Sequence, residues 1–223
     1  MSTSGLGPRR TEGEDCSMKH ICMYVQDTMA DWEHGYLLHG VSLQGATPTP
    51  VCTMSFAADA RDAVTTAGGM RIIPDETLAE TDAEGIDAFV LIGGDTWLSE
   101  DRHAALDLAE AVLAGGGIVA AICGATLGLA SRGLLNNRRH TSNAPELLAA
   151  ITAYRGNDLY EGTPATADRN VITAGSAGSL LWAKLILEEL ELYGKDVLDA
   201  WFDYFRTADP AHFTRMTRAL EAE

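Results

Sequence analysis

The stretch GGGIVAAICGATLGLA, residues 115–130, decides the fold. After its glycines comes an unbroken apolar run, residues 118–122, which predicts a short strand buried on both faces. From Gly124 onward the stretch is rich in small residues, which predicts the opening of a helix. Cys123 therefore lies at a sharp strand-to-helix corner, as the serine of a nucleophile elbow does in α/β-hydrolases. This corner predicts a nucleophile held above the end of a sheet.

The predicted corner also favours an ionised thiol at Cys123. The helix dipole and the free amides of a helix N-terminus stabilise a thiolate relative to a thiol. Gly124 allows a tight turn and the close approach of a substrate. The alternative is that Cys123 only packs in the core, because free cysteine is among the most buried residue types.

The rest of the chain predicts strands alternating with helices. Apolar runs predict strands at 19–25, 50–57, 87–92 and 170–174. Helical spacing or helix-forming composition predicts helices at 31–43, 100–114, 144–154, 176–192, 196–205 and 210–222. Asp31 is the expected N-cap of the first helix, residues 61–74 predict a small hairpin, and residues 139–142 predict a short strand. This alternation predicts an α/β fold with a mostly parallel sheet covered on both faces, whose active site lies at the carboxyl ends of the strands.

Composition excludes several classes of partner. The formal net charge is −16, which would repel nucleic acid and anionic membranes. No run of 18 apolar residues occurs, so no membrane span is expected.

Residues 1–18 lack the apolar segment of a secretory signal, and we expect a disordered leader followed by a single domain over 19–223 with a C-terminal helical extension. Four cysteines without a Cys-x-x-Cys spacing indicate a reduced, cytoplasmic protein with no metal site.

Two further motifs are expected near the thiol. Gly93 and Gly94 follow the strand predicted at 87–92, and backbone amides of this turn could join that of Gly124 in binding an oxyanion. The alternative is an ordinary tight turn. Glu33 follows the first predicted strand, where its carboxyl could share a proton with the thiol of Cys123. The alternative is an acid that only stabilises a helix N-terminus.

Two histidines are candidate bases for a Cys–His pair. His140 lies in a polar segment expected near the end of the sheet. His34 is its rival, because it is adjacent to Glu33. Neither spacing is diagnostic, and a surface histidine is the alternative for each.

These motifs together resemble the PfpI/ThiJ family, the branch of the class I glutamine amidotransferase-like superfamily that includes the Parkinsonism-associated deglycase. The resemblance covers residues 19–192, and its motifs are DWE at 31–33, FVLIGG at 89–94, AAICGA at 120–125 and AGSAG at 174–178. The family implies a flavodoxin-like three-layer sandwich that is usually a homodimer. It also implies Cys123 as nucleophile, Glu33 as the acid touching the sulfur, and Gly94 with Gly124 as oxyanion donors.

Two departures from the family pattern narrow the expected activity. Protease-like members carry histidine directly after the cysteine, where this chain has Gly124. True amidotransferases keep a late histidine, and residues 170–180 contain none. Asn143 is expected at the place where some members bring a histidine near the cysteine, so it is a candidate substrate-binding residue.

The resemblance predicts a cysteine-dependent enzyme that needs no cofactor. Its expected substrate is a small carbonyl or acyl compound such as an α-oxoaldehyde, with a peptide or amide as the other option. A redox-sensing or chaperone-like stress protein that uses the same cysteine without turnover is the alternative. A regulatory binding module that has kept only the fold is a third possibility.

Overall fold

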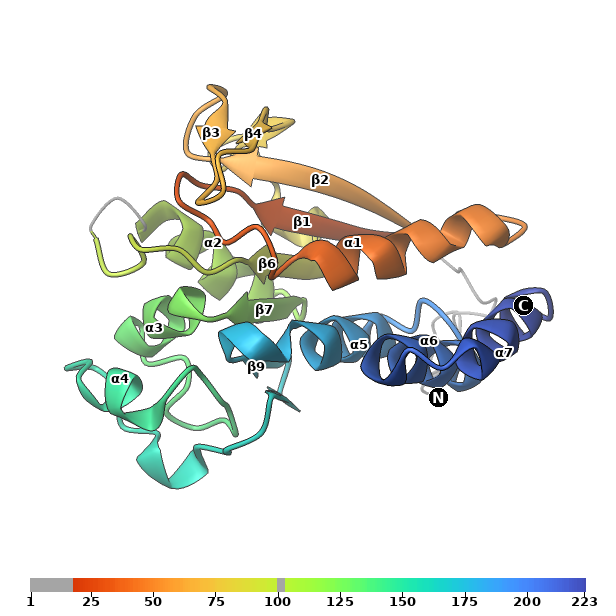
Figure 1. Ribbon diagram of the computed structural model, residues 1–223. Coiled ribbons are helices and arrows are strands. Elements are labelled where there is room, and N and C mark those ends of the chain that lie inside the picture. Colours follow the sequence, from red (N-terminus) through yellow and green to blue (C-terminus); the bar gives the residue numbers. More distant parts are fainter. Residues whose placement is uncertain (1–17, 100–102) are drawn as a thin grey trace, which may run out of the picture.

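A seven-stranded sheet runs through the centre of the molecule, in the order β5-β2-β1-β6-β7-β9-β8 (Figure 1). The computed structural model describes residues 18–99 and 103–223, so the predicted leader and the start of the helix predicted at 100–114 lie outside it. The strands are β1 Lys19–Tyr24, β2 Cys52–Ala58, β5 Glu76–Thr77, β6 Ala88–Leu91, β7 Ile118–Ile122, β8 Ala165–Asp168 and β9 Val171–Ala174. All neighbouring pairs are parallel except β8 with β9. The mostly parallel sheet expected from the sequence is confirmed.

Helices cover both faces of this sheet. Within β1, Ile21 and Met23 belong to one apolar core and Cys22 and Tyr24 to the other, because successive side chains of a strand point to opposite faces. Helices α1, α5, α6 and α7 pack in the first core, and α2, α3 and α4 in the second. Their bounds are α1 Gly35–Ser42, α2 His103–Ala114, α3 Gly124–Ser131, α4 Pro145–Ala149, α5 Ser179–Glu189, α6 Lys195–Thr207 and α7 Pro210–Leu220. The molecule is therefore the expected flavodoxin-like three-layer sandwich.

The expected N-cap role of Asp31 is wrong. Helix α1 begins at Gly35, with His34 at its N-cap. The carboxylate of Asp31 instead accepts hydrogen bonds from the hydroxyl of Thr66 and the backbone N–H of Gly68. Both partners belong to the turn of the predicted hairpin, whose strands are β3 Val64–Thr65 and β4 Arg71–Ile72. Asp31 thus ties the hairpin to the segment that follows β1.

Several other boundaries differ from the predictions. Strands β5 and β8 lie in segments that were not predicted as strands, and the expected strand at 139–142 forms only an isolated bridge between His140 and Tyr160. Helix α4 is shorter than the predicted helix over 144–154. The helix predicted over 176–192 opens with a 3-10 turn at Ser176–Gly178 before α5. Further 3-10 turns in the described part of the chain are Leu43–Ala46, Ala83–Gly85 and Asn157–Leu159.

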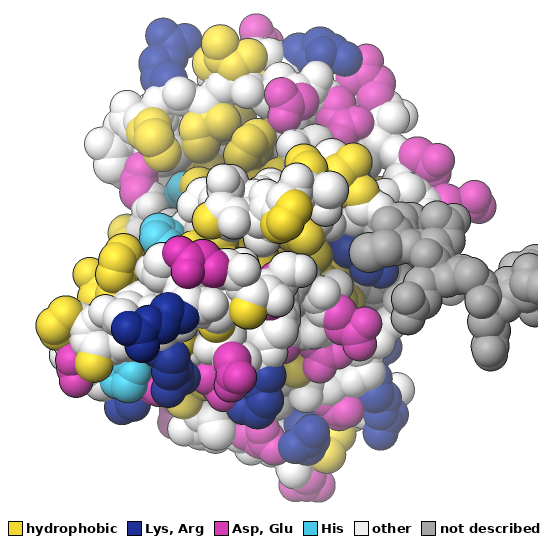
Figure 2. Space-filling view, turned by 90° about the vertical axis from the view of Figure 1, so that its right-hand side faces the viewer, with side chains coloured by type: hydrophobic (Ala, Val, Ile, Leu, Met, Phe, Trp, Pro, Cys, Tyr) yellow, Lys and Arg dark blue, Asp and Glu magenta, His cyan; other side chains and the backbone are white. Residues whose placement is uncertain are grey.

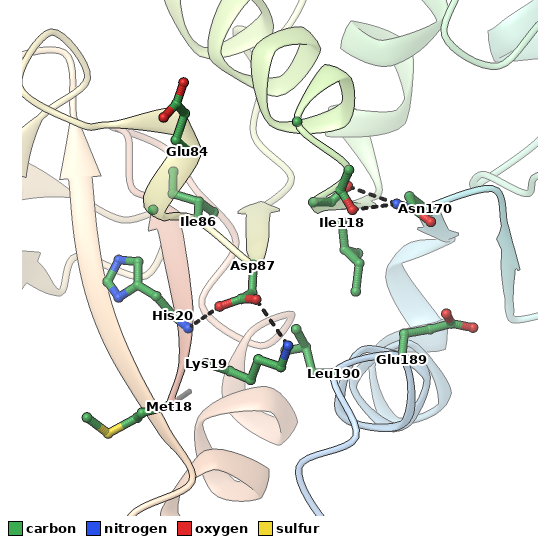
Figure 3. A pocket seen from close by; sticks show the side chains of 14 residues that line it. Met18, Lys19, His20, Glu84, Ile86, Asp87, Ile118, Asn170, Glu189 and Leu190 are labelled. Atoms are coloured by element: carbon green, nitrogen blue, oxygen red, sulfur yellow. Dashed lines mark hydrogen bonds and ion pairs between the residues drawn. The ribbon is translucent and has the colours of Figure 1, made fainter. Parts of the chain in front are cut away.

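A cavity of about 530 Å³ lies at the amino ends of the strands (Figure 3). Lys19, the first residue of β1, pairs there with Asp87 at 3.3 Å, and the side-chain amide of Asn170 donates to the carbonyl of Gly116. Figure 2 shows this end of the molecule, where acidic and basic side chains are interspersed. Cys123 follows the opposite end of β7, so this cavity is remote from the thiol. Among the described residues, no helix has the length and apolar character needed to cross a bilayer.

Candidate active site

Cys123 occupies the predicted corner between β7 and α3. Its backbone has a positive φ of 56° with ψ of −123°, a strained conformation for a residue with a side chain. Its N–H donates to the carbonyl of Ala174 at 3.0 Å, which fixes the corner against β9. The residue is half-buried rather than packed away. The corner therefore holds the thiol at the carboxyl ends of the central strands, where a reagent can reach it.

The carboxyl group of Glu33 is fully buried beside this thiol. One of its oxygens accepts a hydrogen bond from the hydroxyl of Ser176 at 2.7 Å, and the other accepts the N–H of Gly93 at 2.8 Å. The side chain of Glu33 also lies beside the sulfur of Cys123, close enough for each group to shift the pKa of the other. Burial raises the pKa of Glu33, against the lowering effect of these hydrogen bonds. The carboxyl is thus fixed in place and poised to carry a proton.

Asn143 contacts the sulfur with a fixed orientation of its amide. Its Nδ2 donates to Cys123 Sγ at 3.1 Å, and its Oδ1 accepts the backbone N–H of Ser176 at 2.7 Å. The second bond assigns the NH₂ group to the sulfur. Ser176 therefore orients both side chains that touch the thiol, Asn143 and Glu33. It was not singled out from the sequence, although it lies in the AGSAG motif.

The electrostatic environment corrects the expectation that the helix N-terminus lowers the pKa of the thiol. Burial raises the pKa of Cys123, and a charged Glu33 raises it further. The N–H donors of Asn143 and Gly124 act in the opposite direction and are outweighed. Burial raises the pKa of Glu33 as well, so the environment favours the neutral form of both the thiol and the carboxyl.

Gly93 and Gly124 lie beside the thiol and leave no room for side chains. A Cβ at Gly124 would lie 2.6 Å from the carbonyl oxygen of Gly94, so the histidine of protease-like members has no space here. The N–H of Gly93 is bonded to Glu33, which removes it from the expected substrate donors. Across the described residues, the N–H of Gly94 has no hydrogen-bond acceptor, and it lies beside Gly124. Gly94 therefore keeps an open N–H beside the site, whereas the N–H of Gly124 faces the sulfur of Cys123, and the role of the two amides as oxyanion donors stays a prediction.

The structure does not bring His140 to the thiol, so its expected role as the base is wrong. Its Nδ1 donates to the carbonyl of Arg138 at 2.7 Å, and its Nε2 accepts from the hydroxyl of Tyr154 at 2.7 Å. Burial lowers its pKa, so the ring stays neutral. His34 is also buried, and its pKa is lowered by burial. The polar groups on the sulfur come instead from Asn143, Glu33 and Gly124.

A second cavity, of about 380 Å³, adjoins this group of side chains. Asn143 and Ser176 form part of its wall, together with Thr141, Ser142, Tyr160, Gly162, Thr163, Pro164, Gly175, Ala177 and Gly178. Within the described ranges, no group of three or more His, Cys, Asp or Glu side chains is placed to bind a metal. The groups around Cys123 are a thiol, a carboxyl and amide donors, which can perform thiol and proton-transfer chemistry.

A family model described as the DJ-1/PfpI family matches residues 19–189. The chain belongs to the DJ-1/PfpI family. It is 34% identical over 208 residues to the uncharacterized protease YoaZ of Bacillus subtilis, covering 91% of this chain and 98% of that protein. It is similar to a thiJ/pfpI family protein from Bacillus anthracis, with a TM-score of 0.86, 34% identity and 92% and 99% of the two chains covered. The DJ-1 superfamily protein Atu0886 from Agrobacterium tumefaciens gives a TM-score of 0.77, 29% identity and 86% and 99% coverage.

Proposed function

We propose that this DJ-1/PfpI protein converts small α-oxoaldehydes to α-hydroxy acids with Cys123 as nucleophile. The observation that carries the proposal is the group around one sulfur atom: the Asn143 amide donor at 3.1 Å and the buried Glu33 carboxyl, with the amides of Gly94 and Gly124 close by. Such a group supplies a nucleophile, a proton carrier and oxyanion donors, which are the parts that carbonyl addition requires.

The proposed reaction balances without an external oxidant. The sulfur of Cys123 adds to the aldehyde carbon, and the oxygen takes up the proton held by the thiol–carboxyl pair, which gives a hemithioacetal. Glu33 then moves the C1 proton to C2 through an enediol, so that C1 is oxidised to a thioester while the C2 ketone is reduced to an alcohol. Water cleaves the carbon–sulfur bond and releases the α-hydroxy acid and the thiol.

Peptide hydrolysis is less well supported, although the relative YoaZ is named a protease. An amine leaving group must receive a proton as the peptide bond breaks. Position 124 has no space for histidine, and both ring nitrogens of His140 are engaged elsewhere. Addition of the thiol to an aldehyde releases no leaving group that must be protonated. Glu33 can therefore serve as the only proton-transfer group in this reaction.

The test compares the wild type with Cys123→Ala on methylglyoxal, with lactate formation as the readout. We expect lactate from the wild type and a loss of at least 1,000-fold in the variant, since removing a nucleophile abolishes the covalent path. Equal rates in the two proteins would refute the proposal. Casein cleavage by the wild type that is lost in the variant would assign the peptidase function. No turnover of either substrate, with selective gain of two oxygens at Cys123 under peroxide, would assign redox sensing.

A further inference from the structure

Trp32 is an exposed indole held at the edge of the site. It is 59% exposed, whereas each of the other three tryptophans of the chain is at most 2% exposed. Its Nε1–H donates to the hydroxyl of Ser176 at 3.0 Å. The same hydroxyl donates to Glu33, which contacts the sulfur of Cys123. A chain of two hydrogen bonds through the hydroxyl of Ser176 therefore connects the indole to the carboxyl of Glu33 beside the thiol.

The chain on both sides of Trp32 prevents the ring from withdrawing into the core. The residue before it, Asp31, is bonded to the hairpin through Thr66 and Gly68. The residue after it, Glu33, is fully buried and bonded to two partners. This arrangement keeps a large aromatic surface exposed at the edge of the site, where a substrate ring can pack on it.

The cavity beside Ser176 has a neutral lining. None of its eleven lining residues carries a side chain that is charged at neutral pH, and they include the ring of Tyr160 and the ring of Pro164. A carboxylate or phosphate on the substrate would find no cationic side chain there to offset its desolvation. An uncharged group with apolar surface meets no such penalty.

We infer that Trp32 determines substrate specificity, and that the preferred substrates are uncharged aryl α-oxoaldehydes of the phenylglyoxal type. In this arrangement the aldehyde carbon reaches Cys123, and the aryl ring packs on the indole and over the neutral cavity beside Ser176. Aromatic pairs and the buried ring area favour the aryl substrate over methylglyoxal, which offers only a methyl group. The inference rests on the proposed α-oxoaldehyde chemistry and adds the group that the site selects.

The kinetic test measures kcat/KM for phenylglyoxal, methylglyoxal and the charged 4-carboxyphenylglyoxal as initial rates of α-hydroxy acid formation. We expect the wild type to favour phenylglyoxal over methylglyoxal by about tenfold, which corresponds to about 1.4 kcal/mol, and to turn 4-carboxyphenylglyoxal over more slowly than phenylglyoxal. Trp32→Ala should lower the ratio of kcat/KM for phenylglyoxal to kcat/KM for methylglyoxal about tenfold, and Trp32→Phe should retain most of this ratio. Phe213→Ala is the matched control, because Phe213 is 51% exposed on α7, away from the thiol.

A binding test keeps the inference separate from turnover. Calorimetry with Cys123→Ser uses 2-hydroxyacetophenone and hydroxyacetone, unreactive analogues that differ in the aryl ring. We expect about tenfold tighter binding of the aryl analogue, lost in Cys123→Ser/Trp32→Ala. Equal binding of the two analogues, or a Trp32→Ala variant that keeps the preference, would overturn the inference even if aldehydes are turned over. Failure of turnover with the binding preference intact would refute the proposed function alone.

Discussion

Replacing Gly93 by alanine tests the geometry of the site most directly. The new Cβ would lie 2.5 Å from Glu33 Oε2, 2.7 Å from Cys123 Cβ and 3.1 Å from Cys123 Sγ. The Cys123 Cβ is fixed by its backbone, and the carboxyl of Glu33 is fixed by the N–H of Gly93 and the hydroxyl of Ser176. Alanine at position 93 therefore has to displace the carboxyl or distort the corner.

The expected loss in the free energy of unfolding of Gly93→Ala is about 3 kcal/mol. Forcing a methyl group into a packed site costs about 1–3 kcal/mol. Weakening a buried hydrogen bond to a carboxylate adds about 1.5–3 kcal/mol for each bond lost, and the strain is relieved in part as that bond yields. With the carboxyl moved, we also expect at least a 100-fold fall in methylglyoxal turnover. Urea unfolding and lactate formation measure the two effects.

Gly162→Ala is the matched control for this substitution. A Cβ at Gly162 meets nothing within 4 Å, so its stability should stay within about 0.5 kcal/mol of the wild type. If Gly93→Ala retained wild-type stability and wild-type reactivity of Cys123 toward iodoacetamide, the carboxyl could not lie where we place it. The packing argument would then be refuted whether or not the protein is an enzyme.

Two further predictions concern the pKa of the Cys123 thiol and the role of His140. Glu33→Gln should lower the pKa of Cys123, because a charge that disfavours the thiolate is replaced by a neutral amide, and Asn143→Ala should raise it, because an N–H donor to the sulfur is lost. The pH dependence of iodoacetamide labelling of Cys123, read by peptide mass, should therefore move to lower pH in Glu33→Gln and to higher pH in Asn143→Ala. Movement of both variants in the same direction would contradict the assignment. His140→Phe should leave kcat/KM for methylglyoxal within about twofold while lowering stability by about 1–3 kcal/mol, because it strands the buried hydroxyl of Tyr154. A tenfold fall in kcat/KM at a temperature where the variant is folded would restore His140 to the mechanism.

The strands with strong apolar runs were predictable from sequence, and the weak edge strands were not. The run Ile118–Ile122 is apolar throughout because β7 is buried on both faces in the middle of the sheet. Strand β8 reads Ala-Thr-Ala-Asp and lies at the edge, where pairing with β9 alone defines it. Its residues carry little strand preference of their own, so a single sequence gives no signal for it.

The candidate site was predictable to the level of residue types but not of individual contacts. The motif around Cys123 indicated the corner, and the DWE motif indicated the acid. The sequence did not predict that the N–H of Gly93 donates to Glu33 while the N–H of Gly94 has no acceptor among the described residues. The directions of two adjacent N–H groups are set by the conformation of the folded turn, which a single sequence does not specify. His140 was misassigned because its partners Arg138 and Tyr154 are set by tertiary packing.

The hydrogen bond between Ser176 and Glu33 joins residues 143 positions apart in the chain. During synthesis on the ribosome, Cys123 emerges before Ser176, so the nascent thiol is formed without the hydroxyl that fixes its neighbouring acid. The hydrogen bonds around the thiol are complete only after β9 has joined the sheet, because the turn that follows β9 contains Ser176. Thiol reactivity can therefore report whether this turn has reached the site, because a chain without it lacks the hydroxyl and the N–H that orient Glu33 and Asn143.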